Sequence, residues 1–154
     1  MLHFRHAVRE AVFKDGKLDW TGTGVSQERQ KGAEALQNLL DIMPKFHGTL
    51  YRGCSFENAD DAGKYLDLLF DGPPKLKGLI AVTPAPVMAQ HYASVGKVKS
   101  VPVLPTSQNG AYFGPHSTQP EDEEALIRYR FYLKGLKTLK RDDILYVPAE
   151  EVPR

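Results

Sequence analysis

Glycine and proline divide this chain into many short segments, and that division limits the folds it can form. The sequence contains 13 glycines and 11 prolines among 154 residues, and both residue types interrupt helices and strands. The clearest interruption is Asp71-Gly72-Pro73-Pro74. We therefore expect short helices and strands joined by substantial loops. A chain of this length has room for one sizeable core, so residues 1–154 are predicted to form a single domain.

Apolar residues at helical spacing predict three helices. The first begins after Ser26, a good N-cap, and ends at Pro44. The second covers Ala59 to Phe70 and places Tyr65 on its apolar face. The third runs from Pro86 to Ser94, with a proline suited to the first turn. Residues Leu2 to Phe13 fit either an opening helix or a strand.

Short apolar runs between turn residues predict strands at Phe46 to Cys54, Leu79 to Thr83, Lys97 to Leu104 and Ile144 to Val147. Pro102 lies inside the third run. Proline lacks the backbone N–H that a ladder hydrogen bond needs, so Pro102 predicts an edge strand. The fold class expected from these elements is α+β.

The side chains from Glu124 onward alternate between apolar and polar. Ile127 and Phe131 share one face with other apolar residues, whereas Arg128 and Lys134 lie on the opposite face. The acidic start also suits the first turn of a helix, but the density of Ile, Tyr and Phe favours one half-buried strand.

Composition excludes several classes of partner. The formal net charge is +1, which gives no long-range field to attract nucleic acid or an anionic membrane. Cys54 is the only cysteine, so it forms no internal disulfide and favours a reducing compartment. The N-terminus lacks the apolar core of a signal peptide, and no later stretch reaches spanning length. We expect a cytoplasmic protein, either of its own cell or of a host that it enters, without a membrane partner.

No metal site is predicted. His3 and His6 have the spacing of two ligands on one helical turn, but no third ligand is marked out near them. A histidine on a helix, such as His91, is more often structural than catalytic.

Three segments carry more information than composition, and they occur in a fixed order. They are LYRG at Leu50 to Gly53, AVTPAPVMAQHYAS at Ala81 to Ser94, and NGAYFGPHSTQPEDEEALI at Asn109 to Ile127. Together they resemble the mono-ADP-ribosyltransferases of bacterial toxins and phages. That family has a Tyr/Trp-Arg-Gly strand end, then a Ser-x-Ser strand followed by an Ala-x-x-Phe/Tyr-Ala helix. A Glu-x-Glu or Gln-x-Glu follows, immediately before an apolar strand.

The resemblance spans about residues 46 to 130 and transfers residue by residue. Arg52 matches the family arginine, the segment Ala89 to Ala93 matches the helix, and Glu124, directly before Ala125-Leu126-Ile127, matches the catalytic glutamate.

Two positions depart from the family pattern. Ala81 and Thr83 stand where the family has Ser-x-Ser, so one hydroxyl is missing. Asp122 stands where the family has Glu or Gln, and Glu121 and Glu123 lie close enough to shift the register.

The resemblance implies a split, mostly antiparallel β core flanked by helices, with NAD bound as substrate between the two sheets. The reaction would transfer ADP-ribose to a side chain of a protein acceptor, for example an arginine, and release nicotinamide. Cleavage develops positive charge on the ribose, which a carboxylate such as Glu124 would stabilise. Arg52 would clamp the pyrophosphate with its planar donors.

Further roles are expected around this pair. Gly53 accompanies Arg52 in the NAD site, Thr83 hydrogen-bonds the ribose or braces Glu124, and Tyr112 or Phe113 stacks on the nicotinamide ring. The carboxylate of Asp122 accepts a proton from the incoming nucleophile.

Other interpretations stay open. Arg52 also fits a strand-end arginine paired with a surface acid, and residues 121–124 fit a solvated acidic turn or a helix first turn. Ala81 motivates a binding or structural protein that keeps the fold without catalysis. An enzyme of related architecture acting on another nucleotide, such as an RNA 2′-phosphotransferase or a nuclease-like protein, is the remaining rival.

Overall fold

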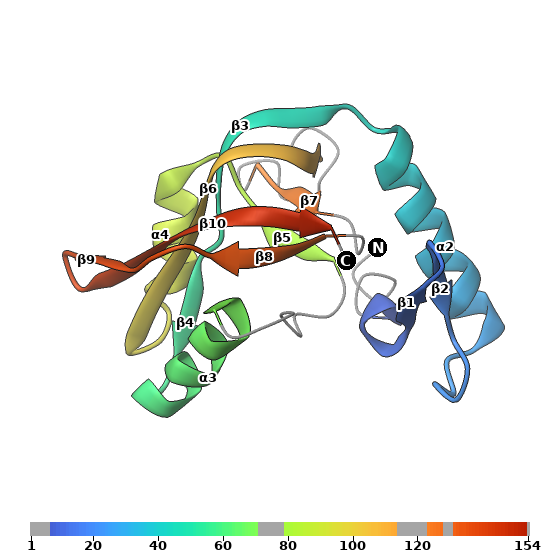
Figure 1. Cartoon of the computed structure of the whole chain (residues 1–154), viewed down its shortest axis with the longest axis horizontal. Helices are drawn as coiled ribbons and strands as arrows, with labels where there is room; N and C mark the ends of the chain where they lie inside the picture. Colours follow the sequence, from blue (N-terminus) through green and yellow to red (C-terminus); the bar gives the residue numbers. More distant parts are fainter. Residues whose placement is uncertain (1–6, 71–78, 114–122, 128–130, 154) are drawn as a thin grey trace.

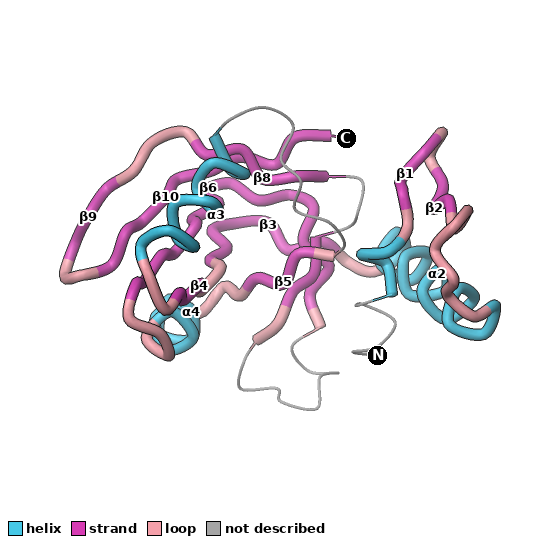
Figure 2. Tube along the Cα trace, turned by 90° about the horizontal axis from the view of Figure 1, so that it is seen from below, coloured by secondary structure: helices cyan, strands magenta, loops and turns pink. Residues whose placement is uncertain are grey.

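The computed structural model describes residues 7–70, 79–113, 123–127 and 131–153. Within these ranges a long mixed sheet forms the centre of the molecule, and three α-helices lie around it (Figure 1). Helix α2 and a small hairpin lie together at one end of the molecule (Figure 2). The expected α+β class is confirmed.

The described N-terminal segment is a short helical turn followed by a hairpin. A 3-10 helix at Val8–Glu10 precedes strands β1 (Val12–Lys14) and β2 (Lys17–Asp19). The hairpin turn uses Asp15 and Gly16, with φ of 50° and 77°, the left-handed conformations that a two-residue hairpin loop requires. Residues 2–6 of the predicted opening element lie outside the described residues.

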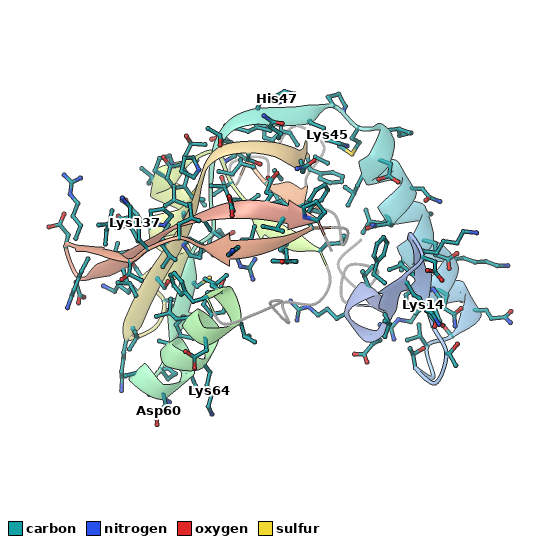
Figure 3. The ribbon with its side chains drawn as sticks, in the orientation of Figure 1. Lys14, Lys45, His47, Asp60, Lys64 and Lys137 are labelled. Carbon is teal, nitrogen blue, oxygen red and sulfur yellow. The ribbon has the colours of Figure 1, made fainter. Side chains whose placement is uncertain are left out.

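Helix α2 (Gln27–Ile42) begins and ends as its sequence predicts. The Ser26 hydroxyl accepts a hydrogen bond from Arg29 N at 3.3 Å, which satisfies one free N–H of the first turn. At the other end, Lys45 Nζ donates to the carbonyls of Leu40 and Met43. This lysine, labelled in Figure 3, caps carbonyls that have no partner within the helix.

Strands β3 (Lys45–Tyr51) and β4 (Cys54–Phe56) replace the single strand expected over this region. Both pair with β6 (Val98–Tyr112), and the end of β3 at Leu50 and Tyr51 shares its register with β4 across the interruption at Arg52 and Gly53. Helix α3 (Ala59–Phe70) follows as predicted. Its exposed face carries Asp60 and Lys64, which point away from the sheet (Figure 3).

Strand β6 corrects two expectations. It extends to Tyr112 rather than ending near Leu104, and the two register shifts against β3 show how bulges let the strand continue past Pro105. Pro102 is fully buried, with β10 on one side and the Arg52 segment on the other, so the predicted edge position is wrong. The missing N–H is accommodated because β3 and β4 break opposite it.

The segment from Glu124 forms two strands rather than one. Strand β7 (Ala125–Ile127) is buried at all three positions and pairs with β5 (Ile80–Val82) and with β6. Strand β8 (Phe131–Gly135) instead pairs with β10 (Ile144–Pro153). Apolar clusters cover both faces of β7, with Ala125 and Ile127 in one cluster and Leu126 in the other, and the alternating pattern did not predict that.

The sheet splits where β6 and β10 separate. These strands pair in parallel from Lys99 opposite Ile144 to Val103 opposite Pro148. Beyond that point β6 continues against β3 and β7, whereas β10 continues against β8; the other recorded strand pairs, including β9 (Leu139–Arg141) with β10, are antiparallel. The split, mostly antiparallel core is therefore present.

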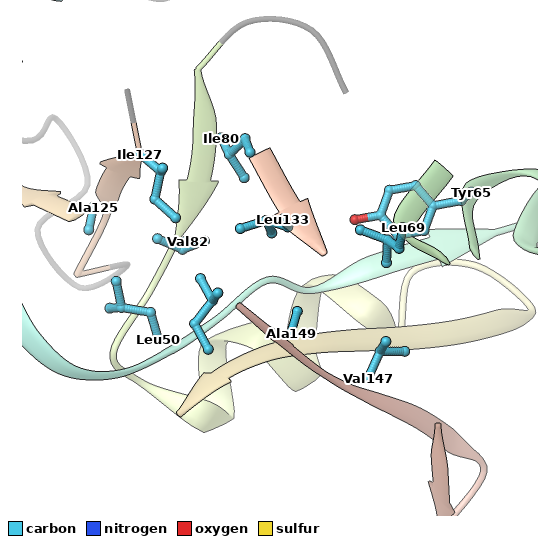
Figure 4. Packing of buried hydrophobic residues seen from close by; sticks show 11 residues of the cluster. Leu50, Tyr65, Leu69, Ile80, Val82, Ala125, Ile127, Leu133, Val147 and Ala149 are labelled. Atoms are coloured by element: carbon cyan, nitrogen blue, oxygen red, sulfur yellow. The ribbon is translucent and has the colours of Figure 1, made fainter. Parts of the chain in front are cut away.

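The main core lies between the two diverging halves of the sheet. Leu50, Val82 and Ile127 come from one half, Leu133 and Val147 come from the other half, and α3 contributes further apolar side chains (Figure 4). A second apolar cluster packs α2 against the other face of β5 and β7, with Leu126 at its centre among other buried residues: Ala33, Leu36, Leu40, Leu79, Ala111 and Phe113. Both faces of the β5–β7 pair are thus covered.

Candidate active site

Arg52 lies in the break between β3 and β4, and Pro102 explains the break. Arg52 N donates to Pro102 O at 2.9 Å, but a proline has no N–H to donate back. The second hydrogen bond of this residue pair therefore cannot form, although the flanking pairs keep the same register. The Arg52 side chain reaches β5, where Nη1 donates to Ala81 O at 2.9 Å.

The described groups that interact with the Arg52 guanidinium are polar but uncharged. The phenol of Tyr65, from α3, and the thiol of Cys54 lie beside it. Its Nε is buried and has no hydrogen-bond partner in the part of the chain that the structure describes. Among the described residues, none of the groups that interact with Arg52 is a carboxylate. A partly buried cation without a counter-charge is less favourable than one whose surroundings an anion completes.

Tyr65 and Cys54 interact with each other as well as with Arg52. Cys54 Sγ donates to Tyr65 Oη at 3.4 Å. Burial raises the pKa of the Tyr65 phenol, the neighbouring Cys54 raises it further, and Arg52 lowers it. Because the net shift is upward, the phenol stays protonated at neutral pH and does not neutralise Arg52.

Thr83 joins β5 to the strand that carries Arg52. Its backbone forms an isolated bridge with Tyr51, with N–H···O distances of 2.8 Å in both directions. The Thr83 hydroxyl accepts a hydrogen bond from Ala85 N at 3.1 Å, immediately before helix α4 (Pro86–Ala93). The side chain is 6% exposed, so this threonine helps fix the start of α4.

Glu124 precedes β7 at the same corner. The β5–β7 register pairs Val82 with Ala125, and one further step places Thr83 opposite Glu124. Phe113 N donates to Glu124 O at 2.8 Å, so the backbone of Glu124 is also tied to the end of β6. The Glu124 side chain is half-buried. Backbone pairing thus brings Arg52, Thr83 and Glu124 to one end of the β3, β5 and β7 strands.

The two aromatic candidates differ in their surroundings. Tyr112 is half-buried, and its hydroxyl donates to Glu123 Oε1 at 3.4 Å. Partial desolvation, followed by the Glu123 carboxylate, raises the Tyr112 pKa. Phe113 is 4% exposed and packs in the α2 cluster. Tyr112 is therefore the aromatic ring of the pair with an exposed edge, whereas Phe113 anchors Glu124 through its backbone.

Gly53 is required by packing. A Cβ at this position would lie 2.1 Å from Ala89 O and 2.8 Å from Tyr92 Cβ. Ala89 and Ala93 on α4 are fully buried, so small residues on both sides allow the helix to approach the strand. The Ala-x-x-Tyr-Ala pattern of the sequence is therefore the helical half of this close contact.

Ala81 uses its backbone rather than its side chain at this corner. Its carbonyl holds Arg52, and its methyl group packs against the α2 cluster. The hydroxyl missing from the Ser-x-Ser pattern is therefore replaced by an apolar contact with the N-terminal part of the chain.

Some predicted residues lie elsewhere or outside the described ranges. Asp122 lies outside the described residues, in the range 114–122. His3 and His6 also lie outside them, in the range 1–6. His91 is exposed on α4 and contacts the ring of Tyr92. Sequence reasoning assigned Tyr65 only to the apolar face of its helix and gave Cys54 no site role. A periodic pattern indicates which residues are buried, and it does not indicate which polar group they meet.

A cavity of about 250 Å³ lies away from this corner, where β6 and β10 diverge. Its lining contains none of the predicted site residues and consists of Leu104, Thr106, Gln108, Asn109, Ala149, Glu150 and Glu151.

Comparison by sequence gave no match: no protein-family model and no curated protein matches this chain. Comparison by structure found solved proteins of similar fold. HopU1, an ADP-ribosyltransferase of Pseudomonas syringae pv. Tomato, superposes with a TM-score of 0.66 at 16% identity, covering 98% of this chain and 64% of HopU1. The Vis toxin from Vibrio splendidus, also an ADP-ribosyltransferase, gives a TM-score of 0.65 at 16% identity, covering 98% of this chain and 66% of Vis.

Exoenzyme S from Pseudomonas aeruginosa, in a structure bound to carba-NAD and human 14-3-3 protein beta, gives a TM-score of 0.56 at 14% identity. That match covers 97% of this chain and 66% of Exoenzyme S. The chain thus spans about two thirds of the length of these three proteins. In the described ranges, no helix is both long and apolar enough to cross a membrane. The chain has the fold of the mono-ADP-ribosyltransferases.

Proposed function

We propose that this protein transfers ADP-ribose from NAD to a side chain of a protein acceptor and releases nicotinamide. The observation that carries the proposal is the half-buried Arg52 guanidinium, which among the described residues has no carboxylate partner and has a buried Nε without a hydrogen bond. Such a group suits the pyrophosphate of a dinucleotide. Support comes from the fold, since Exoenzyme S has been seen with carba-NAD.

Arg52 binds and orients the dinucleotide in this proposal. Ala81 O takes one guanidinium hydrogen bond, which leaves other N–H groups of the planar fork for phosphate oxygens. Gly53 keeps the backbone close to α4 and so fixes the segment from which Arg52 projects. Tyr112, whose ring is half-buried at the end of β6, stacks on the nicotinamide.

Glu124 supplies the electrostatic stabilisation. Breaking the bond between ribose and nicotinamide leaves positive charge on the ribose ring, and a carboxylate that hydrogen-bonds a ribose hydroxyl lowers the energy of that state. Thr83, opposite Glu124 in the extended register, carries a hydroxyl that both accepts and donates hydrogen bonds. It braces the carboxylate or the ribose.

An arginine side chain of the acceptor is the proposed nucleophile. Asp122 would accept the proton that the nucleophile loses, two residues before Glu124 as the family pattern requires. The Vis toxin has been seen in complex with agmatine, a small guanidine compound. Binding of a guanidine compound therefore has a precedent in this fold.

The experiment is nicotinamide release from NAD by the purified protein, with and without agmatine. Wild type should release nicotinamide faster when agmatine is present. Glu124→Gln should lower kcat, and Arg52→Lys, which keeps the charge and loses the fork, should raise KM. Arg141→Lys, on exposed strand β9, is the matched control and should behave as wild type. Absence of both NAD binding and turnover in the wild type would refute the proposal.

A binding protein without catalysis is the second candidate, and the apolar packing of Ala81 favours it. Such a protein would bind NAD or its protein partner with no release of nicotinamide. Calorimetric NAD binding alongside the turnover assay separates this candidate from the enzyme.

A further inference from the structure

We propose that Tyr65 is a positioning residue for Arg52, through which helix α3 presents the guanidinium to the NAD pyrophosphate. This inference rests on the proposed function, since it concerns the same site. The sequence marks Tyr65 only as an apolar-face helical residue, whereas the structure places its hydroxyl beside Arg52.

Tyr65 is itself held rigidly. Its side chain is 9% exposed in the main core. Its ring lies 5.4 Å from the ring of Phe56, centroid to centroid, in a tilted arrangement. Figure 4 shows Tyr65 beside Leu69 at the α3 side of the core. A hydroxyl on a ring packed this tightly keeps a fixed place.

Cys54 orients the phenol oxygen. The thiol donates to Tyr65 Oη at 3.4 Å, so the oxygen accepts from the thiol and faces the guanidinium with its remaining lone pair. Cys54 and Arg52 are two residues apart on a nearly extended segment, and both therefore point toward α3.

The chemistry of a phenol suits an anion site better than a carboxylate would. A carboxylate would form a strong bidentate pair with Arg52, and a phosphate would have to displace it. A protonated phenol orients the N–H groups without adding negative charge. The phenol therefore fixes the orientation of the guanidinium, and the guanidinium can still attract an anion.

The first test compares NAD kinetics of Tyr65→Phe with those of Tyr146→Phe. Tyr146 is a matched control because its hydroxyl only accepts a hydrogen bond from Gln90 Nε2 at 3.1 Å, away from Arg52. Tyr65→Phe should raise KM for NAD about tenfold, the size of one lost hydrogen bond to a charged group, and leave kcat almost unchanged. An unchanged KM, or a fall in kcat alone, would overturn the inference.

The second test keeps the inference separate from the proposed function. It measures inorganic pyrophosphate binding and urea unfolding for wild type, Tyr65→Phe, Arg52→Ala and the double variant. The inference holds if Tyr65→Phe weakens pyrophosphate binding and the two substitutions are non-additive in unfolding. Additive effects, or equal pyrophosphate binding by wild type and Tyr65→Phe, would overturn it. If NAD is not turned over while these signs of coupling appear, the proposed function fails and the positioning role stands.

Discussion

The carbonyl oxygen of Ala89 occupies the space that a Cβ on Gly53 would need, at 2.1 Å. Helix α4 and the Arg52 segment approach each other across this contact, where Gly53 contributes no side chain. The position of Arg52 is thus set by a backbone-to-backbone contact.

Gly53→Ala should destabilise the protein by about 3 kcal/mol, because the obstructing atom belongs to a backbone that cannot move aside cheaply. Urea unfolding measures this change. Gly63, inside α3, is the matched control, since a Cβ there meets nothing within 4 Å. Gly63→Ala should stabilise by about 0.5 to 1 kcal/mol. Equal stability of Gly53→Ala and wild type would show that the space between residue 53 and Ala89 O can accommodate a Cβ.

Glu123 and Glu124 should differ in function. Glu124 is proposed to stabilise the charge on the ribose, so Glu124→Gln should lower kcat on the order of 100- to 1,000-fold. Glu123 accepts a hydrogen bond from Tyr112, and Glu123→Gln keeps an acceptor there, so it should keep most of its activity. Nicotinamide release measures both variants. The reverse result would shift the catalytic register by one residue.

Glu151 should contribute to stability through the bulged part of β6. Its carboxylate accepts hydrogen bonds from the Ser107 hydroxyl, the Gln108 N–H and the Asn109 side-chain amide. Glu151→Gln should therefore lower the free energy of unfolding by about 1 to 3 kcal/mol. Glu150→Gln is the control, because Glu150 is exposed, and chemical denaturation should show almost no change for it.

Tyr65 should make stability fall at alkaline pH. Its pKa is raised in the folded protein above the ordinary value of 10.0, so the unfolded chain loses this proton first. The resulting stability is present in full below pH 10 and is lost as the pH rises toward the folded-state pKa.

Urea unfolding of wild type and Tyr65→Phe, above and below pH 10, checks this expectation. Tyr65→Phe should lose less stability over the alkaline range than wild type and Tyr146→Phe. An equal loss in all three proteins would assign the effect to other groups.

The sequence by itself determined the elements whose signals are local. Ser26 and Pro44 bound α2 because capping and proline geometry act within one turn. The three ordered segments around Arg52, Ala89 and Glu124 also indicated the fold, which the structural matches bear out.

Only the tertiary structure decided how strands pair and what the site residues touch. Pro102 lies in a central strand because β3 and β4 break opposite it, and that break lies some fifty residues away in the sequence. The contact of Arg52 with the uncharged side chains of Tyr65 and Cys54 likewise depends on the packing of α3 against the sheet. Periodicity records whether a position is buried, whereas the partner of a buried polar group depends on contacts between segments remote in the chain.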